Sequence, residues 1–156
     1  MIYTVARELP GTLSMMAAPQ GDLDVVLAEL RAHGVDTLVS LLPPEQVTML
    51  YLTDEPNAAL RAGLAFRSLP VPDFGVPDHA EFARPLRELS DELTAGRHVA
   101  VHCWGGVGRS SLVAAALLVV RGSTPEAAWH LITHARGVPV PETDEQRVWV
   151  DALARQ

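Results

Sequence analysis

The chain has 156 residues, a formal net charge of −7 and 48% hydrophobic residues, enough apolar material for one domain with a sizeable core. Its twelve basic residues are all arginines scattered along the chain. General nucleic-acid binding is therefore not expected, because it needs clustered positive charge. The absence of lysine excludes a Walker A phosphate loop, which needs Gly-Lys-Ser/Thr, and Schiff-base catalysis.

The single cysteine, Cys103, limits the chemistry further. One cysteine cannot form an internal disulfide or supply a thiolate cluster for zinc, and we expect neither a metal nor a cofactor. The longest strictly apolar run, residues 112–120, is too short to cross a bilayer, and the first residues lack the layout of a signal peptide. We therefore expect a cytoplasmic protein with no membrane partner.

Turn residues and hydrophobic periodicity predict alternating strands and helices. In chain order we expect strands at residues 3–6 and 12–16, a helix after Asp22, a strand at 36–42, helices at 45–51 and 55–62, a strand at 64–69, a helix after Asp78, a strand at 97–102, and helices at 110–121, after Thr124 and after Thr143. Strands separated by helices favour parallel pairing. The pattern predicts one α/β domain over residues 1–156, with a central, mostly parallel sheet flanked by helices.

The segment VHCWGGVGRSS, residues 101–111, joins the last predicted strand to an almost wholly apolar helix. Cys103 begins a loop that runs to Gly108, and Arg109 begins the helix. Backbone N–H groups at a helix N-terminus bind anions, and glycines let the backbone approach a ligand closely. The loop is therefore a predicted oxyanion cradle, whose field favours the thiolate of Cys103. The planar fork of Arg109 can hold two oxygens of the same anion.

A thiolate that attacks phosphorus needs a proton donor for the leaving group. Asp73, in the loop VPDFGVPD at residues 71–78, is the best acid; its rival Asp78 is better explained as a helix cap. Ser110 can donate a hydrogen bond to the departing sulfur. We expect His102 to order the loop through hydrogen bonds, because a strand directs its side chain away from that of Cys103.

These residues resemble the protein tyrosine and dual-specificity phosphatases, which share the signature His-Cys-x5-Arg-Ser/Thr and a mobile Pro-Asp loop. The resemblance is greatest to the kinase-associated and other atypical dual-specificity phosphatases. It covers the second half of the chain well, whereas the first half matches only in the order of its elements. It implies that Cys103 is the nucleophile, Arg109 the phosphate clamp, Asp73 the general acid and Ser110 the thiolate stabiliser. It also implies a phosphate cradle made by the backbone amides of Trp104, Gly105, Gly106, Val107, Gly108 and Arg109.

Three departures from the family pattern bear on specificity and on the positioning of the attacking water. Val71 stands where tyrosine-specific members have tryptophan, which favours the dual-specificity branch. Gln146 aligns with the second glutamine of the family's Gln-Thr-x-x-Gln loop and is expected to support the site, whereas Glu142 replaces the first. The cysteine loop also lacks the lysines with which lipid phosphatases of the superfamily hold inositol phosphates, so a phosphoinositide substrate is not favoured.

We therefore expect a phosphoric monoester hydrolase that acts on phosphorylated protein, phosphotyrosine first and phosphoserine or phosphothreonine second, through a cysteinyl-phosphate intermediate. A lone cysteine is more often a small buried hydrophobe, but the glycines, Arg109, Ser110 and the Pro-Asp loop together favour the nucleophile. Two alternatives stay open: an inactive phosphopeptide-binding module and a sulfurtransferase-like cysteine enzyme. Trp104 fits either the rim of the pocket or the core.

Overall fold

The structure is a computed structural model that describes residues 1–6 and 10–156. Within these residues the strands form one sheet with the order β1-β2-β5-β3-β4. Their bounds are β1 Ile2–Ala6, β2 Thr12–Met16, β3 Thr37–Ser40, β4 Ala65–Ser68 and β5 His98–His102. β2, β5, β3 and β4 run parallel, and β1 pairs antiparallel with β2. The expected single α/β domain with a mostly parallel sheet is confirmed.

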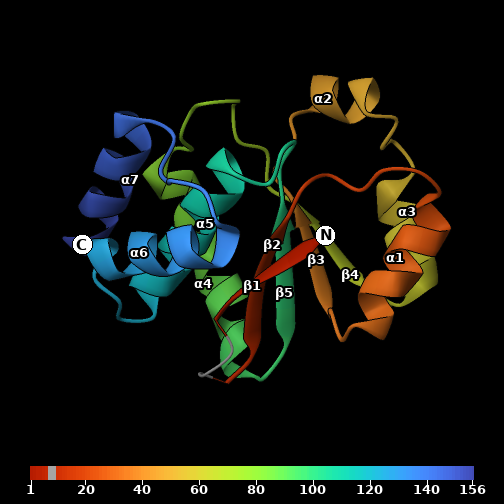
Figure 1. Cartoon of the computed structure of the whole chain (residues 1–156), viewed down its shortest axis with the longest axis horizontal. Helices are drawn as coiled ribbons and strands as arrows, with labels where there is room; N and C mark the ends of the chain where they lie inside the picture. The colour runs from red at the N-terminus through yellow and green to blue at the C-terminus, as the bar shows by residue number, and fades with distance from the viewer. Residues whose placement is uncertain (7–9) are drawn as a thin grey trace.

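The helices form a layer on each face of the sheet. Their bounds are α1 Leu23–Ala32, α2 Pro44–Met49, α3 Glu55–Ala62, α4 His79–Thr94, α5 Gly108–Val120, α6 Pro125–Arg136 and α7 Asp144–Ala154. Helices α1 and α3 lie on one side of the sheet and α4 to α7 on the other, while α2 lies beyond the carboxyl ends of the strands (Figure 1). Within the described residues no helix has the length and apolar character needed to cross a bilayer.

The alternation of side chains along the central strands explains the two layers. Leu38 of β3 and Ala100 of β5 belong to the apolar cluster under α1 and α3, whereas Val39, Val99 and Val101 belong to the larger cluster under α4 and α5. Both faces of these strands are thus covered, which is why their central residues are apolar. Helix α5 is buried along nearly its whole length, as its apolar sequence predicted.

The element boundaries differ from the predicted ones by one or two residues. Strand β3 ends at Ser40 rather than at residue 42, although Leu41 still donates to the carbonyl of His102. Helix α5 begins at Gly108 rather than later, because the carbonyl of Val107 already accepts from the N–H of Ser111 at 3.2 Å. The loops that follow β3, β4 and β5 all leave the carboxyl edge of the sheet, where ligands bind in parallel α/β folds.

Candidate active site

Cys103 directly follows β5 and lies at the base of a pocket at the carboxyl edge of the sheet. Its residue surface is only 3% exposed, and its Sγ lies 3.2 Å from the Oγ of Ser110 in the first turn of α5. Ser110 is fully buried, so its hydroxyl is kept from water and lies against the sulfur. The structure brings the expected nucleophile and the expected thiolate stabiliser into direct contact.

The loop after Cys103 is held by Arg136, the last residue of α6. The Nε of Arg136 donates to the carbonyl of Gly106 at 2.8 Å, and its Nη2 donates to the carbonyl of Gly105 at 3.3 Å. A trans peptide directs a carbonyl and the following N–H to opposite sides. The N–H groups of Gly106 and Val107 therefore point away from Arg136. This arrangement leaves backbone donors available for an anion in the pocket.

Gly106 is required by the close approach of the loop to the end of β2. Its φ is +73°, and a Cβ atom there would lie 2.6 Å from the nitrogen of Ala17 and 2.7 Å from the carbonyl carbon of Met16. The same strand end supports the loop through the N–H of Ala18, which donates to the carbonyl of Trp104 at 3.0 Å. Glycine at this position thus lets the loop wrap tightly around the pocket.

Arg109 extends from the start of α5 across the base of the pocket and is 3% exposed. Its Nη1 donates to the side-chain oxygen of Gln46 at 2.8 Å and to the carbonyl of Val71 at 3.2 Å. Its Nη2 lies 3.3 Å from a carboxylate oxygen of Asp73. The guanidinium is therefore oriented by two neutral acceptors, and among the described residues its one carboxylate contact is the 3.3 Å approach to Asp73.

Asp73 lies in the loop between β4 and α4, with its side chain 46% exposed. Besides Arg109, the Nε2 of Gln46 contacts its carboxylate at 3.2 Å. The rival acid Asp78 caps α4, since its carboxylate accepts from the N–H of Glu81 at 3.0 Å. Of the two candidates, the structure brings Asp73 to the cysteine pocket and gives Asp78 a structural contact.

Glu142 and Gln146 have different positions relative to the pocket. Glu142 lines it, and its carboxylate lies so close to Gly108 that a Cβ there would overlap it. Gln146 is fully buried, and its Oε1 accepts from the N–H of Glu142 at 3.1 Å. Within the described residues its Nε2 has no hydrogen-bond partner. Gln146 thus supports the segment that carries Glu142 and is not among the residues that line the pocket.

His102 lies behind the cysteine and is fully buried. Its Nδ1 is 3.1 Å from the carbonyl oxygen of Cys103, and its Nε2 is 2.6 Å from a carboxylate oxygen of Glu55. These contacts agree with the expected role in ordering the loop. His102 does not line the pocket.

The pocket has a volume of about 230 Å³ and is lined by Asp73, Phe74, Cys103, Trp104, Gly105, Val107, Gly108, Arg109 and Glu142. Trp104 is 39% exposed and therefore belongs to the rim rather than to the core.

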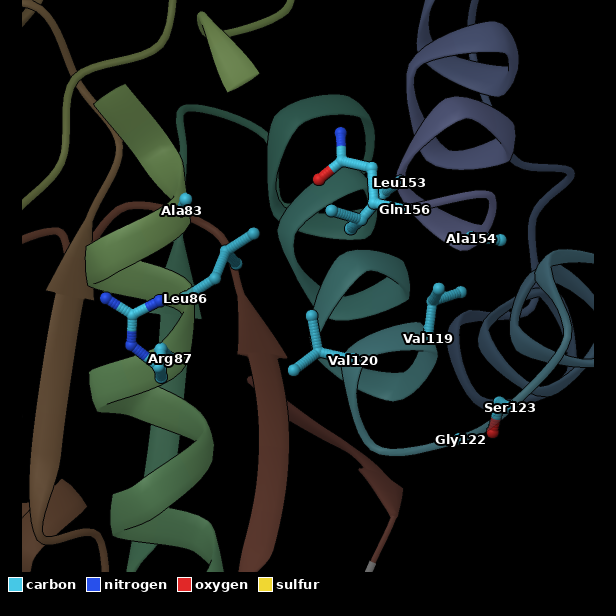
Figure 2. A pocket seen from close by; sticks show the side chains of 10 residues that line it. All are labelled: Ala83, Leu86, Arg87, Val119, Val120, Gly122, Ser123, Leu153, Ala154 and Gln156. Atoms are coloured by element: carbon cyan, nitrogen blue, oxygen red, sulfur yellow. The ribbon is translucent and has the colours of Figure 1, made fainter. Parts of the chain in front are cut away.

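A larger hollow of about 470 Å³ lies between α4, α5 and the end of α7, with Arg87 as its charged side chain (Figure 2). Its lining holds no thiol or carboxylate side chain, so the smaller pocket is the candidate active site.

Three residues of this region were not predicted from the sequence: Gln46, Glu55 and Arg136. Gln46 comes from α2, Glu55 from α3 and Arg136 from α6, all far along the chain from Cys103. None of them stands in a motif, and each reaches the site only because the helices pack around the sheet. Their contacts therefore carry no local sequence signal.

Comparisons with known proteins agree with this geometry. The family model described as "Swiss Army Knife protein, DSP-PTPase phosphatase domain" (PTP-SAK) matches residues 8–147. Cyclin-dependent kinase inhibitor 3 of Homo sapiens is 29% identical over 120 residues, which cover 76% of this chain and 57% of that protein. The Sus scrofa protein of the same name is 37% identical over 86 residues, which cover 54% and 41%. The chain thus spans about half the length of these curated relatives.

Solved structures share the fold. Kinase associated phosphatase superimposes with a TM-score of 0.85 at 23% identity, covering 100% of this chain and 97% of the other. Tk-PTP in its active form gives 0.78 at 25% identity, covering 99% and 97%. Pseudomonas aeruginosa TpbA gives 0.64 at 26% identity, covering 98% and 94%. The chain belongs to the PTP-SAK family of DSP-PTPase phosphatase domains, within the superfamily of cysteine-dependent protein tyrosine and dual-specificity phosphatases.

Proposed function

We propose that residues 1–156 form one phosphatase domain that hydrolyses phosphoric monoesters on proteins, phosphotyrosine above all, through a phosphoryl intermediate on Cys103. The observation that carries the proposal is the composition of the pocket. It combines a thiol 3.2 Å from a buried hydroxyl with a buried guanidinium and a half-exposed carboxylate. These are a nucleophile, a phosphate clamp and a proton donor within one cavity.

In the first half-reaction the substrate phosphate binds the loop amides and the guanidinium of Arg109. The thiolate of Cys103 attacks phosphorus, and an S–P bond forms as the ester P–O bond breaks. The leaving oxygen takes its electron pair and receives the proton of Asp73. The long 3.3 Å contact between Arg109 and Asp73 is exchanged for contacts to phosphate, which frees Asp73 for the leaving group.

In the second half-reaction water attacks phosphorus and gives its proton to the carboxylate of Asp73. The S–P bond breaks, inorganic phosphate leaves, and the thiolate of Cys103 returns. The hydroxyl of Ser110, 3.2 Å from the sulfur, donates a hydrogen bond that stabilises the thiolate. Asp73 ends the cycle protonated and ready to act as an acid again.

An aromatic rim supports phosphotyrosine as the preferred substrate. Phe74 of the Asp73 loop and Trp104 of the cysteine loop both line the pocket, and they are 62% and 39% exposed. Phe74 has a φ of +59°, a left-handed conformation that is costly for a bulky residue. Two exposed rings at one entrance can pack against an aryl ester. Pseudomonas aeruginosa TpbA, 26% identical, was solved in complex with pTyr, which agrees with this preference.

Negative charge at the pocket argues against phosphoinositides. The carboxylates of Asp73 and Glu142 line the cavity with Arg109 as its one lining cation among the described residues. A substrate with several phosphate groups would place further anions beside these carboxylates, which is unfavourable. A monoester on a protein chain brings only one phosphate group to the cradle.

The proposal is tested by turnover against a panel of phosphotyrosine, phosphothreonine, phosphoinositide and small-metabolite substrates, with Cys103→Ser as the control. We expect turnover to be greatest with phosphotyrosine peptides and to be lost in Cys103→Ser. Phosphopeptide binding without turnover in the wild type would identify a binding module instead. Formation of a persulfide from thiosulfate, with no phosphate release, would identify a sulfurtransferase.

A further inference from the structure

The end of helix α2 carries a strained tyrosine. The N–H of Leu52 donates to the carbonyl of Val47 at 2.9 Å, and the N–H of Tyr51 donates to that of Thr48 at 3.2 Å. These two bonds form a Schellman motif, whose left-handed position is usually glycine. Tyr51 occupies that position with a φ of +57°. Its backbone therefore adopts a conformation that is costly for a residue with a bulky side chain.

The other helix ends show how the chain ordinarily solves this problem. Five helices, α1, α3, α4, α5 and α6, each end within two residues of a glycine with positive φ: Gly34, Gly63, Gly96, Gly122 and Gly137. The side chain of Tyr51 is not used inside the fold, since the residue is 90% exposed and makes no side-chain hydrogen bond or ring contact with the described residues. Strain that the fold does not repay indicates a role outside the fold.

Tyr51 lines a hollow of about 350 Å³ between the end of α2 and the loop that joins β2 to α1. Pro19 and Leu23 line it from the side of the loop, and Met49 lines it together with Tyr51 from α2. None of the lining residues is charged at neutral pH, although the chain has a net charge of −7. Met49 is 61% exposed. An exposed methionine and an exposed tyrosine beside an uncharged hollow are typical of the centre of a protein interface.

Both walls of the hollow are connected to the candidate active site. On α2, Gln46 lies one helical turn before Met49, and its side chain contacts the pocket arginine at 2.8 Å. On the other wall, Ala18 directly precedes Pro19, and its N–H donates to the carbonyl of Trp104 at 3.0 Å. α2 lies beyond the carboxyl ends of the strands (Figure 1), at the edge where the cysteine loop also begins. The hollow therefore continues the surface around the catalytic pocket.

We propose that this hollow is a docking site for the phosphorylated protein substrate, and that it takes an apolar side chain from the chain that flanks the phosphorylated residue. The inference rests on the proposed protein phosphatase function. The phosphorylated residue enters the catalytic pocket, and the flanking chain crosses α2. Its apolar side chain packs between Met49 and Tyr51, which supply large contact areas at protein interfaces. The left-handed backbone keeps the ring of Tyr51 beside the hollow and out of the core.

The test compares phosphotyrosine peptides built from serine and alanine. One peptide has no large flanking side chain, and each of the others carries a single leucine at a different position on either side of the phosphotyrosine. For the wild type we expect one or more leucine peptides to have a kcat/KM about tenfold greater than that of the plain peptide, because burial of a leucine side chain stabilises the complex. Equal values of kcat/KM for all the peptides would overturn the proposal.

Variants of the hollow identify where the leucine binds. The ratio of kcat/KM between the best leucine peptide and the plain peptide should fall close to one in Tyr51→Gly, fall in Met49→Ser and persist in Tyr51→Phe, which keeps the ring. Leu60→Ala is the matched control and should keep the ratio, because Leu60 is 76% exposed on α3 but does not line the hollow. A ratio that is unchanged in Tyr51→Gly would exclude this docking site.

Stability and oligomeric state separate docking from the other roles of an exposed ring. Tyr51→Gly should unfold in urea at a midpoint no lower than that of the wild type, because relief of the left-handed strain offsets the greater freedom of glycine in the unfolded chain. A lower midpoint would show that the ring stabilises the fold. A dimeric wild type with a monomeric Tyr51→Gly would show that a second copy of the chain covers the hollow. Either result would overturn the proposal.

Failure of the proposed function gives a different result from failure of the docking site. A wild type that hydrolyses none of the phosphate esters would refute the phosphatase function. Fluorescence anisotropy then decides the docking site without turnover, from binding of the same peptides to Cys103→Ser. The Kd of the best leucine peptide should be about tenfold lower than that of the plain peptide, and the added substitution Tyr51→Gly should remove the difference. Equal Kd values in Cys103→Ser would contradict docking.

Discussion

The two ends of the parallel strands use charged side chains in opposite ways. At the amino ends, Asp36 accepts from Arg31 at 2.6 Å and from the N–H of His98 at 2.8 Å. Beside it, Arg97 pairs with Glu92 at 3.2 Å. Each of these charges is paired with an opposite charge or a main-chain donor. These contacts at the amino ends of the sheet therefore stabilise the folded state.

At the carboxyl ends, His102 and Glu55 are in contact at 2.6 Å behind the cysteine, whereas the pocket arginine is incompletely paired. Arg109 is buried, yet its shortest contact is to the neutral amide of Gln46 at 2.8 Å, and within the described residues its one carboxylate contact is to Asp73 at 3.3 Å. A cation kept partly unpaired in a pocket can bind an incoming anion. The contrast is between charges paired with opposite charges at the amino ends and a pocket arginine that is held mainly by neutral acceptors. Substitutions in the pocket at the carboxyl ends should therefore change turnover, whereas substitutions at the amino ends should change stability.

The largest effect is expected for Asp73→Asn, which removes the proton donor. We expect kcat/KM, which reports the first half-reaction, to fall by about 10²–10⁴-fold with phenyl phosphate, and by less with p-nitrophenyl phosphate, whose leaving group needs little protonation. Asp78→Asn is the matched control, because asparagine also caps helices well, and it should retain activity. Equal losses with both esters would exclude Asp73 as the acid.

Gln46 is expected to show the next largest effect, because it contacts both Arg109 and Asp73. Gln46→Leu removes the acceptor for the guanidinium and should lower kcat/KM roughly 10- to 100-fold, the range for a hydrogen bond to a charged group. Gln46→Glu keeps that acceptor but places a second carboxylate beside Asp73. The pH profile of Gln46→Glu should therefore extend to higher pH on its basic side. Identical profiles for Gln46→Glu and the wild type would show that Gln46 does not act on Asp73.

Glu142→Gln tests the carboxylate that faces the cradle. Removal of one negative charge near the phosphate is worth about 1 kcal/mol, so KM for p-nitrophenyl phosphate should fall roughly fivefold with little change in kcat. The control is Glu145→Gln, an exposed residue in the first turn of α7, which should leave KM unchanged. A higher KM in Glu142→Gln would mean that the carboxylate assists substrate binding.

At the amino end the expected effect is on stability alone. Burial by itself raises the pKa of Asp36, but hydrogen bonds from the N–H of His98 and from Arg31 outweigh it and hold the pKa below its ordinary 3.8. A carboxyl with a lowered folded-state pKa stabilises the protein above that value, and the contribution is lost as the pH falls through the lowered pKa. Asp36→Asn should therefore cost about 1–2 kcal/mol at pH 7 and progressively less below pH 3.8.

Urea denaturation at pH 7 and pH 3 measures this difference, and kcat of Asp36→Asn should match that of the wild type. Asp24→Asn is the control, because its ion pair with Arg61 is exposed and such pairs contribute little. A loss of turnover in folded Asp36→Asn would contradict the prediction that charges at the amino ends of the strands affect stability and not catalysis.

Features that depend on neighbouring residues were predictable from the sequence. The strand, glycine loop and buried helix around Cys103 follow from local pattern, and so do the caps Asp22, Asp78, Thr124 and Thr143, each of which accepts a main-chain hydrogen bond in the structure. The parallel sheet followed from strands alternating with helices. These features require only short-range rules of turn chemistry and periodicity.

Features that depend on packing between distant segments were not predictable. Gln46, Glu55 and Arg136 come from three helices and contact Arg109, His102 and the cysteine loop, respectively. No spacing in the chain indicates these contacts. The sequence identified Glu142 as a departure from a motif. That its carboxylate lies against Gly108 could be seen only in the folded structure. Gln146, expected to support the site, does not line the pocket; it is buried, and its amide oxygen accepts from the N–H of Glu142.

The central claim, a phosphoryl intermediate on Cys103, is tested most directly by acid-quenching the protein during turnover of p-nitrophenyl phosphate and measuring the mass of the peptide that contains Cys103. The account predicts that this peptide gains one phosphoryl group in the wild type and accumulates it in Asp73→Asn, whose water attack is slowed. Steady turnover in the wild type with no phosphoryl group on Cys103 in either protein would contradict it.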